Sequence, residues 1–161
     1  MQLNPETDIE IVRHLAAPPA MVWRCWSEPD LFRQWYAPKP WTIPEAVLDL
    51  RPGGRFYMIW AGTEGQSFAN EGAFLAAVPQ QKLVFTDLMT QGFVPVPAVS
   101  PDFGPAYTAV LTFEPEGTGT LYRAVARHST ADDAKANREM GFQEGWTVTA
   151  DQLDALATGL M

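Results

Sequence analysis

The last twenty residues carry an apolar stripe with the spacing of an α-helix. Its members follow one another in steps of three or four residues, which places them on one helix face: Phe142, Trp146, Thr149, Leu153, Leu156 and Leu160. The chain upstream is rich in β-forming segments, and a sheet with one apolar face needs a second layer to cover it. The sequence therefore predicts a sheet covered by one long C-terminal helix.

Seven β-rich segments and two short helical ones precede this helix. Short turns join most of the β-rich segments, which favours antiparallel pairing. Pro19 and Pro29 are each suited to the first turn of a helix, so two short helices are expected directly after the first strand. The predicted strands are residues 8–15, 41–50, 55–60, 68–78, 82–87, 107–113 and 120–128, and the predicted short helices are residues 19–27 and 30–36. This order predicts an α+β fold.

The C-terminal helix is expected to begin at a cap formed by Ser129 or Thr130, with acidic residues in its first turn. Gly141 and Gly145 interrupt its interior, where each costs about 1 kcal/mol relative to alanine. They indicate either a kink near Gly141 or a close approach of the helix to the sheet.

Length and charge limit the classes of function. The 161 residues suit one domain, residues 1–161. Eleven basic and nineteen acidic residues leave a net charge of −8, which disfavours nucleic acid and anionic membrane surfaces as partners. No segment approaches the ~20 apolar residues of a membrane span. The single cysteine and the absence of a signal-peptide pattern favour a cytoplasmic location.

The sequence contains few candidates for chemistry. Two histidines and one cysteine show no metal-binding spacing, so neither a metal nor a cofactor is expected. Cys25 is interpreted as a core residue. The strand alternation places His128 on the inward face with Tyr122, as a hydrogen-bonded residue at a strand end or as a ligand contact or general base. The carboxylates of Asp49 and Glu71 are expected to lie at an edge of the sheet or to face outward, and not to meet as a catalytic pair.

Several short motifs resemble, in their order, the AHSA1-like branch of the SRPBCC (START/Bet v 1-like) superfamily, which is named for an activator of the Hsp90 ATPase. They are PPAMVW (18–23), QWYAP (34–38), DLRPGGRF (49–56), EGAF (71–74), LVFT (83–86) and MGFQEGW (140–146). The resemblance covers nearly the whole chain. It implies a helix-grip fold: a curved antiparallel sheet of about seven strands, two short helices after the first strand, and a long C-terminal helix packed across the sheet above a cavity. It implies no reaction.

The resemblance and the small residues Ala124 and Ala126 on the inward face of the last strand together indicate a cavity. We therefore expect this chain to bind a small hydrophobic or aromatic ligand there. The expected ligand contacts are Trp35, Phe56, Met58, Trp60, Phe93, Tyr122, His128, Met140, Trp146, Thr149 and Leu153. Residues 88–107, with four prolines, are interpreted as a lid over the cavity or as a homodimer contact.

Two other functions stay open. One is an enzyme of cyclase or hydrolase type that uses the same cavity, with His128 as the sole catalytic candidate. The other is a protein-interaction module, including a co-chaperone of Hsp90, which is disfavoured because no N-terminal Hsp90-binding region precedes the domain.

Overall fold

The computed structural model describes residues 1–97, 99–100 and 102–161. Seven strands form one antiparallel sheet in the order β1-β11-β10-β5-β4-β3-β2. Their bounds are Asp8–Leu15 (β1), Thr42–Leu48 (β2), Arg55–Ala61 (β3), Ser67–Val78 (β4), Lys82–Thr86 (β5), Tyr107–Glu116 (β10) and Gly119–His128 (β11). Irregular register in β2 and β4 marks bulges that bend the sheet.

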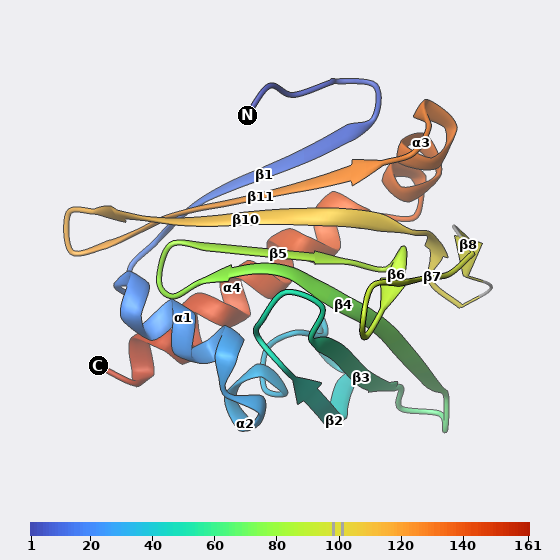
Figure 1. Ribbon diagram of the computed structural model, residues 1–161. Coiled ribbons are helices and arrows are strands. Elements are labelled where there is room, and N and C mark those ends of the chain that lie inside the picture. The colour runs from blue at the N-terminus through green and yellow to red at the C-terminus, as the bar shows by residue number, and fades with distance from the viewer. Residues whose placement is uncertain (98, 101) are drawn as a thin grey trace.

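Four helices accompany the sheet in the described part of the chain. They are α1 (Pro19–Ser27), α2 (Pro29–Phe32), α3 (Ala131–Glu139) and α4 (Phe142–Gly159). Helix α4 runs diagonally behind the sheet, and α1 and α2 lie at one end of it (Figure 1). The predicted α+β helix-grip fold is confirmed, with proline opening both α1 and α2.

The C-terminal region differs from the prediction in one respect. It forms two helices and not one, because Gly141 adopts φ +83°, a left-handed conformation that interrupts the helix. Thr130 caps α3 as expected, its hydroxyl oxygen accepting a hydrogen bond from the backbone N–H of Asp133. The second short helix ends at Phe32, four residues before the predicted end, and continues as turns.

The connection between β5 and β10 contains two small hairpins. The first pairs β6 (Met89–Thr90) with β7 (Val94–Pro95), and the second pairs β8 (Val99–Ser100) with β9 (Gly104–Pro105). Residues 98 and 101, which belong to the segment interpreted as a lid or dimer contact, lie outside the described residues.

Polar side chains anchor the C-terminal half of α4. The Asp154 carboxylate accepts hydrogen bonds from the backbone N–H groups of Ala16 and Ala17, both at 3.1 Å. The Gln152 amide donates to the carbonyls of Trp35 and Ala37 at 2.9 and 2.8 Å. Between these contacts Leu153 is fully buried in the core against the sheet and α1. This half of α4 is therefore fixed to the segments that flank the two short helices.

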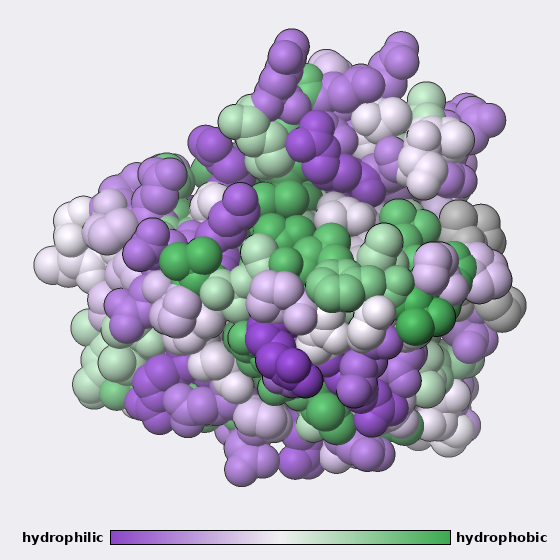
Figure 2. All heavy atoms as spheres, in the orientation of Figure 1, coloured by the Kyte–Doolittle hydropathy of each residue, from purple (hydrophilic) through white to green (hydrophobic). Residues whose placement is uncertain are grey.

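The two faces of the sheet differ in character. In the core, inward-facing Phe56 stacks on Phe74 and meets Phe85 edge to face. On the opposite face, Val84, Val110 and Val125 are paired in one row across β5, β10 and β11. Figure 2 shows the molecule from this side, with apolar surface at the centre and polar side chains around it. Asp49 and Glu71 do not meet: they pair with Arg51 and Arg55 at 2.7 and 2.9 Å.

Cys25 is buried, as interpreted from the sequence. Burial raises the pKa of its thiol to about 11, so the thiol stays protonated at neutral pH and is a poor nucleophile.

We predict that Leu153→Ala lowers the free energy of unfolding by about 2–4 kcal/mol, because the lost side chain leaves an apolar void under α4. Val148→Ala on the same helix serves as the control, since Val148 is 43% exposed, and should cost under ~1 kcal/mol. Urea denaturation measures both values. Equal losses for the two variants would show that α4 is not held by this contact.

Candidate functional site

A hollow of about 240 Å³ lies between the sheet and the N-terminal half of α4. Most of its wall is aromatic. The rings come from α1, the segment after α2, four strands of the large sheet (β3, β5, β10 and β11), the second hairpin and α4. They are Trp26, Trp35, Tyr36, Trp60, Phe85, Phe103, Tyr107, Tyr122, Phe142 and Trp146. Met140 and Gly141 lie where α3 gives way to α4.

Gly145 helps to keep this space open. It lies on the same face of α4 as Phe142 and Thr149, which also line the hollow, because residues three or four apart share a helix face. A Cβ atom placed on Gly145 would meet no atom within 4 Å. Gly145 therefore lowers the stability of α4 by about 1 kcal/mol relative to alanine. It does so at a position where a side chain would project into the hollow.

Of the described residues that line this hollow, Asp87 is the one that is acidic. It follows β5 directly, and its backbone N–H donates to the Tyr107 carbonyl at 3.2 Å. Among the described residues, its carboxylate has neither an ion-pair partner nor a hydrogen-bond donor. Burial raises the pKa of Asp87 to about 7, because the surrounding rings disfavour the charged form.

Two tryptophans leave buried donors unused. The indole nitrogens Nε1 of Trp26 and Trp60 have no hydrogen-bond partner in the described structure, whereas Trp35 Nε1 donates to the Cys25 carbonyl at 2.8 Å. The Tyr122 hydroxyl lies near the Trp26 indole without reaching hydrogen-bond geometry. An unsatisfied buried donor costs about 1–3 kcal/mol. Both side chains line the hollow, so a ligand acceptor that reached either nitrogen from there would remove this cost.

Three tyrosines also contribute hydroxyl groups to the wall of the hollow. Burial raises the pKa of Tyr36, Tyr107 and Tyr122 well above that of an exposed tyrosine. Their hydroxyls therefore remain protonated and uncharged at neutral pH.

His128 does not line the hollow: it contacts Asn137, a lining residue, on the side away from the hollow. Asn137, which does line the hollow, donates from Nδ2 to the Pro105 carbonyl at 3.2 Å, and this contact sets the orientation of its amide. The same nitrogen is 2.7 Å from His128 Nε2, so Nε2 accepts and the proton lies on Nδ1. Nδ1 then donates to the Thr7 carbonyl at 3.0 Å. Burial lowers the pKa of His128, which agrees with this neutral form.

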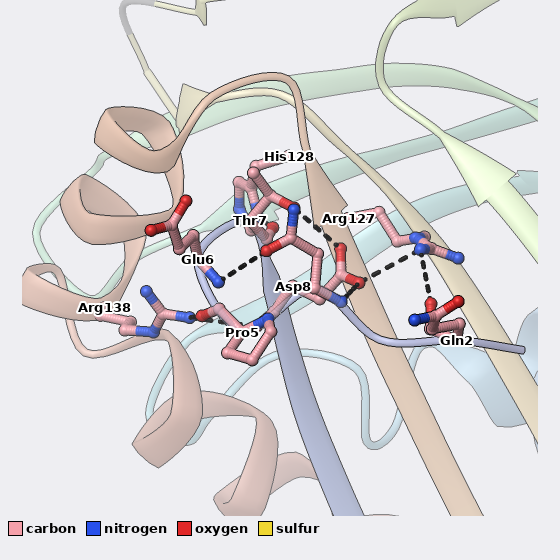
Figure 3. Close-up of polar contacts among 9 residues, drawn as sticks. Gln2, Pro5, Glu6, Thr7, Asp8, Arg127, His128 and Arg138 are labelled. Carbon is pink, nitrogen blue, oxygen red and sulfur yellow. Dashed lines mark hydrogen bonds and ion pairs between the residues drawn. The ribbon is translucent and has the colours of Figure 1, made fainter.

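The N-terminal segment surrounds this histidine (Figure 3). The Arg138 guanidinium on α3 donates to the carbonyls of Pro5 and Asp8, each at 3.0 Å. Arg127 on β11 pairs with the Asp8 carboxylate at 3.2 Å. Both ring nitrogens of His128 are thus engaged with protein groups, and the ring supports Asn137 from behind.

The structure brings together part of the predicted contact set. Trp35, Trp60, Tyr122, Met140, Trp146 and Thr149 line the hollow. Phe56, Met58 and Leu153 lie in the packed core beside it, and His128 lies behind Asn137. Phe93 is half exposed, and its ring lies against Gly53 in the turn between β2 and β3.

Sequence reasoning missed Asp87, although a signal was present. Leu83, Phe85 and Asp87 alternate along one segment, so the period of a strand places Asp87 on the inward face with Phe85. Asn137 carried no such signal, because its role depends on contacts with β9 and the end of β11.

Comparison with known proteins identifies the family. The family model described as "Activator of Hsp90 ATPase homolog 1-like protein" matches residues 16–158. The chain belongs to the AHSA1-like family. Membership supports a ligand-binding domain at a coarse level and agrees with the SRPBCC superfamily resemblance of the sequence.

Solved structures support the same assignment. A crystal structure of a protein from Nitrosomonas europaea is 38% identical to this AHSA1-like domain, with a TM-score of 0.90 over 98% of this chain and 97% of that one. An AHSA1-like protein from Aeromonas hydrophila is 25% identical, with a TM-score of 0.71 over 96% and 95%. No curated protein matches the chain.

Two further observations concern partners. None of the helices in the described part of this AHSA1-like domain has the length and apolar character of a membrane span. Within the same residues, no three histidine, cysteine or acidic side chains are grouped so that they could bind a metal ion.

We predict that Asp87 makes the stability of this AHSA1-like domain depend on pH. Its pKa is raised in the folded state, so folding favours the protonated acid, and stability falls as pH rises from about 4 to about 7. Asp87→Asn resembles the protonated acid and should lack this loss. At pH 8 the variant should be more stable by up to about 4 kcal/mol, and by less where water in the hollow solvates the carboxylate.

Thermal unfolding of both proteins between pH 4 and pH 8 measures this difference. The two curves should meet near pH 4 and separate up to about pH 7. Parallel curves would show that Asp87 is ionised at no cost in the folded protein.

Proposed function

We propose that this AHSA1-like domain binds one small aromatic ligand carrying a hydrogen-bond acceptor, in the hollow beneath α4. The observation that carries this proposal is the pair of buried indole N–H groups, Trp26 Nε1 and Trp60 Nε1, which have no partner in the described part of the chain and belong to side chains that line the hollow. The aromatic wall supplies apolar contact, and the two donors supply a site for an oxygen atom.

The volume limits the size of the ligand. An engineered apolar cavity of ~150 Å³ holds benzene, and this hollow measures about 240 Å³. One or two fused rings therefore fit, whereas a long acyl chain does not. A two-ring group buries roughly 150–250 Å², worth about 4–6 kcal/mol, which corresponds to dissociation constants of about 0.04–1 mM before polar contacts are added.

Any acid–base chemistry in this hollow would use a residue other than His128, the candidate that the sequence suggested. Both nitrogens of His128 are engaged with Thr7 and Asn137. An enzyme of cyclase or hydrolase type would have to use Asp87, which faces the hollow and whose pKa of about 7 suits proton transfer at neutral pH. Turnover of a bound ligand, lost in Asp87→Asn while binding persists, would favour this second candidate.

Filling the hollow tests its use as a binding site. We predict that Gly145→Leu weakens binding of 2-acetylnaphthalene at least tenfold, because the new side chain occupies the space over which Gly145 lies. Gly159→Leu is the matched control: Gly159 is on the same helix with open space around it, but does not line the hollow. Isothermal titration calorimetry gives both affinities. Equal affinities in the two variants would place the ligand elsewhere.

The role of the indole donors can be tested separately. We predict that wild-type protein prefers 2-acetylnaphthalene to 2-ethylnaphthalene, and that Trp60→Phe reduces this preference about two- to tenfold, the value of one hydrogen bond. Trp41→Phe is the control, since Trp41 stacks on Phe68 outside the wall. The ratio of the two dissociation constants, measured for each protein, reports the effect. An unchanged ratio in Trp60→Phe would mean that this indole does not contact the ketone oxygen.

A further inference from the structure

The charge pattern of the wall distinguishes among ligand classes. No lysine, arginine or histidine lines this hollow or the adjacent one of about 300 Å³, within the part of the chain that the structure describes. Asp87, Asn70 and Phe103 line both and so lie between them. The second hollow adds Glu71, whose charge is already balanced by Arg55 at 2.9 Å. The wall thus presents one unbalanced negative group.

Asp87, which is partly buried, differs in its contacts from the buried acid Asp8. The Asp8 carboxylate pairs with Arg127 at 3.2 Å and accepts from the Asn4 backbone N–H at 2.8 Å. Among the described residues, the Asp87 carboxylate has no such partner. Desolvation of a carboxylate that lacks both a cation and hydrogen bonds is costly, so a cation inside the hollow would stabilise it.

The remaining titratable groups that face Asp87 do not oppose this. They are Tyr36 and Tyr107, whose hydroxyls stay protonated because burial raises their pKa, with the charge of Asp87 acting in the same direction. Across the second hollow, Glu71 is paired with Arg55. From the side of α3 and α4 the wall residues are uncharged.

The rings around the hollow provide a second attraction for a cation. Tyr107, Phe142 and Trp146 contact one another with centroid separations of 5.1 to 6.3 Å. Tyr36 and Trp60 form another pair at 5.9 Å on the sheet side. Aromatic faces attract cations through their quadrupole, by about 0.5–2 kcal/mol for each favourable contact. Such rings beside one unpaired carboxylate suit an ammonium group better than a neutral or anionic one.

We propose that the hollow selects a small aromatic ligand that carries an ammonium group, with the cation held between the Asp87 carboxylate and the surrounding rings. This inference rests on the proposed function, since it names the chemical class of the ligand that the same site takes. Carboxylates of similar size are rejected, because they would bring a second negative charge next to Asp87 where no basic side chain lines the wall.

The test compares two probes of nearly the same shape. Phenyltrimethylammonium has a permanent positive charge, and tert-butylbenzene replaces its nitrogen with carbon and is neutral. A third probe, benzenesulfonate, carries a negative charge. Because the cation does not titrate, any change of its affinity between pH 6 and pH 8 reports on the protein. We expect this affinity to rise several-fold over that interval as Asp87 ionises, while that of tert-butylbenzene stays constant and benzenesulfonate does not bind.

Two variants test whether the preference for the cation depends on Asp87. At pH 8, Asp87→Asn should lower the affinity for phenyltrimethylammonium at least tenfold and abolish its pH dependence, and should leave the affinity for tert-butylbenzene within twofold. Retained binding of tert-butylbenzene also shows that the variant is folded. Glu64→Gln removes one exposed charge from the turn between β3 and β4, away from the wall, and should change neither affinity.

The outcomes separate the two proposals. If tert-butylbenzene binds but the cation does not, or if its affinity is the same in Asp87→Asn, the selection for ammonium is wrong and the aromatic binding site stands. If neither probe binds, the selection for ammonium is wrong, and the titration with 2-acetylnaphthalene decides the proposed function: its binding retains the aromatic site, and its failure to bind shows that both proposals are wrong.

Discussion

The uneven attachment of α4 to the sheet determines the rest of this structure. Its C-terminal half is fixed by Asp154, Gln152 and the buried Leu153, which join it to the β1–α1 junction and to the segment after α2. Its N-terminal half has glycine at position 145, over open space. One helix therefore completes the core at one end and covers a hollow at the other.

The polar groups of the hollow depend on different parts of the chain. Asp87 is placed by the end of β5 and by its backbone contact with β10. Asn137 is placed by the break at Gly141, which lets α3 turn away from α4, and by hydrogen bonds to Pro105 and His128. The N-terminal segment, bound to Arg127 and Arg138, supports that histidine in turn. A substitution in the N-terminal segment can thus shift Asn137, a residue of the wall, through its contacts with His128.

Periodicity predicted most of the fold because each pattern needs only local information. The alternation in β11 placed Tyr122 and His128 on the inward face, and both lie on that side of the sheet. The stripe from Phe142 to Leu160 predicted the long helix, and the two prolines predicted the starts of α1 and α2. The break at Gly141 was anticipated only as a kink, because a sequence does not reveal whether a glycine adopts positive φ.

A side chain that faces inward does not necessarily line the hollow, and the sequence did not distinguish the two cases. Phe56 and Trp60 share one face of β3, yet only Trp60 lines the hollow, since Phe56 is enclosed by Phe74 and Phe85. The state of His128 follows from Thr7 and Asn137, which lie 121 and 9 residues away along the chain.

The sequence by itself determined the order of strands and helices, the inward faces and the family resemblance, because these follow from local spacing and turn chemistry. Only the tertiary structure decided which inward side chains pack together and which leave space. It also decided that Asp87 has no counter-ion among the described residues and that both ring nitrogens of His128 have hydrogen-bond partners. The physical reason is that burial, charge balance and free volume arise when segments distant in the chain are brought together, and no local pattern records them.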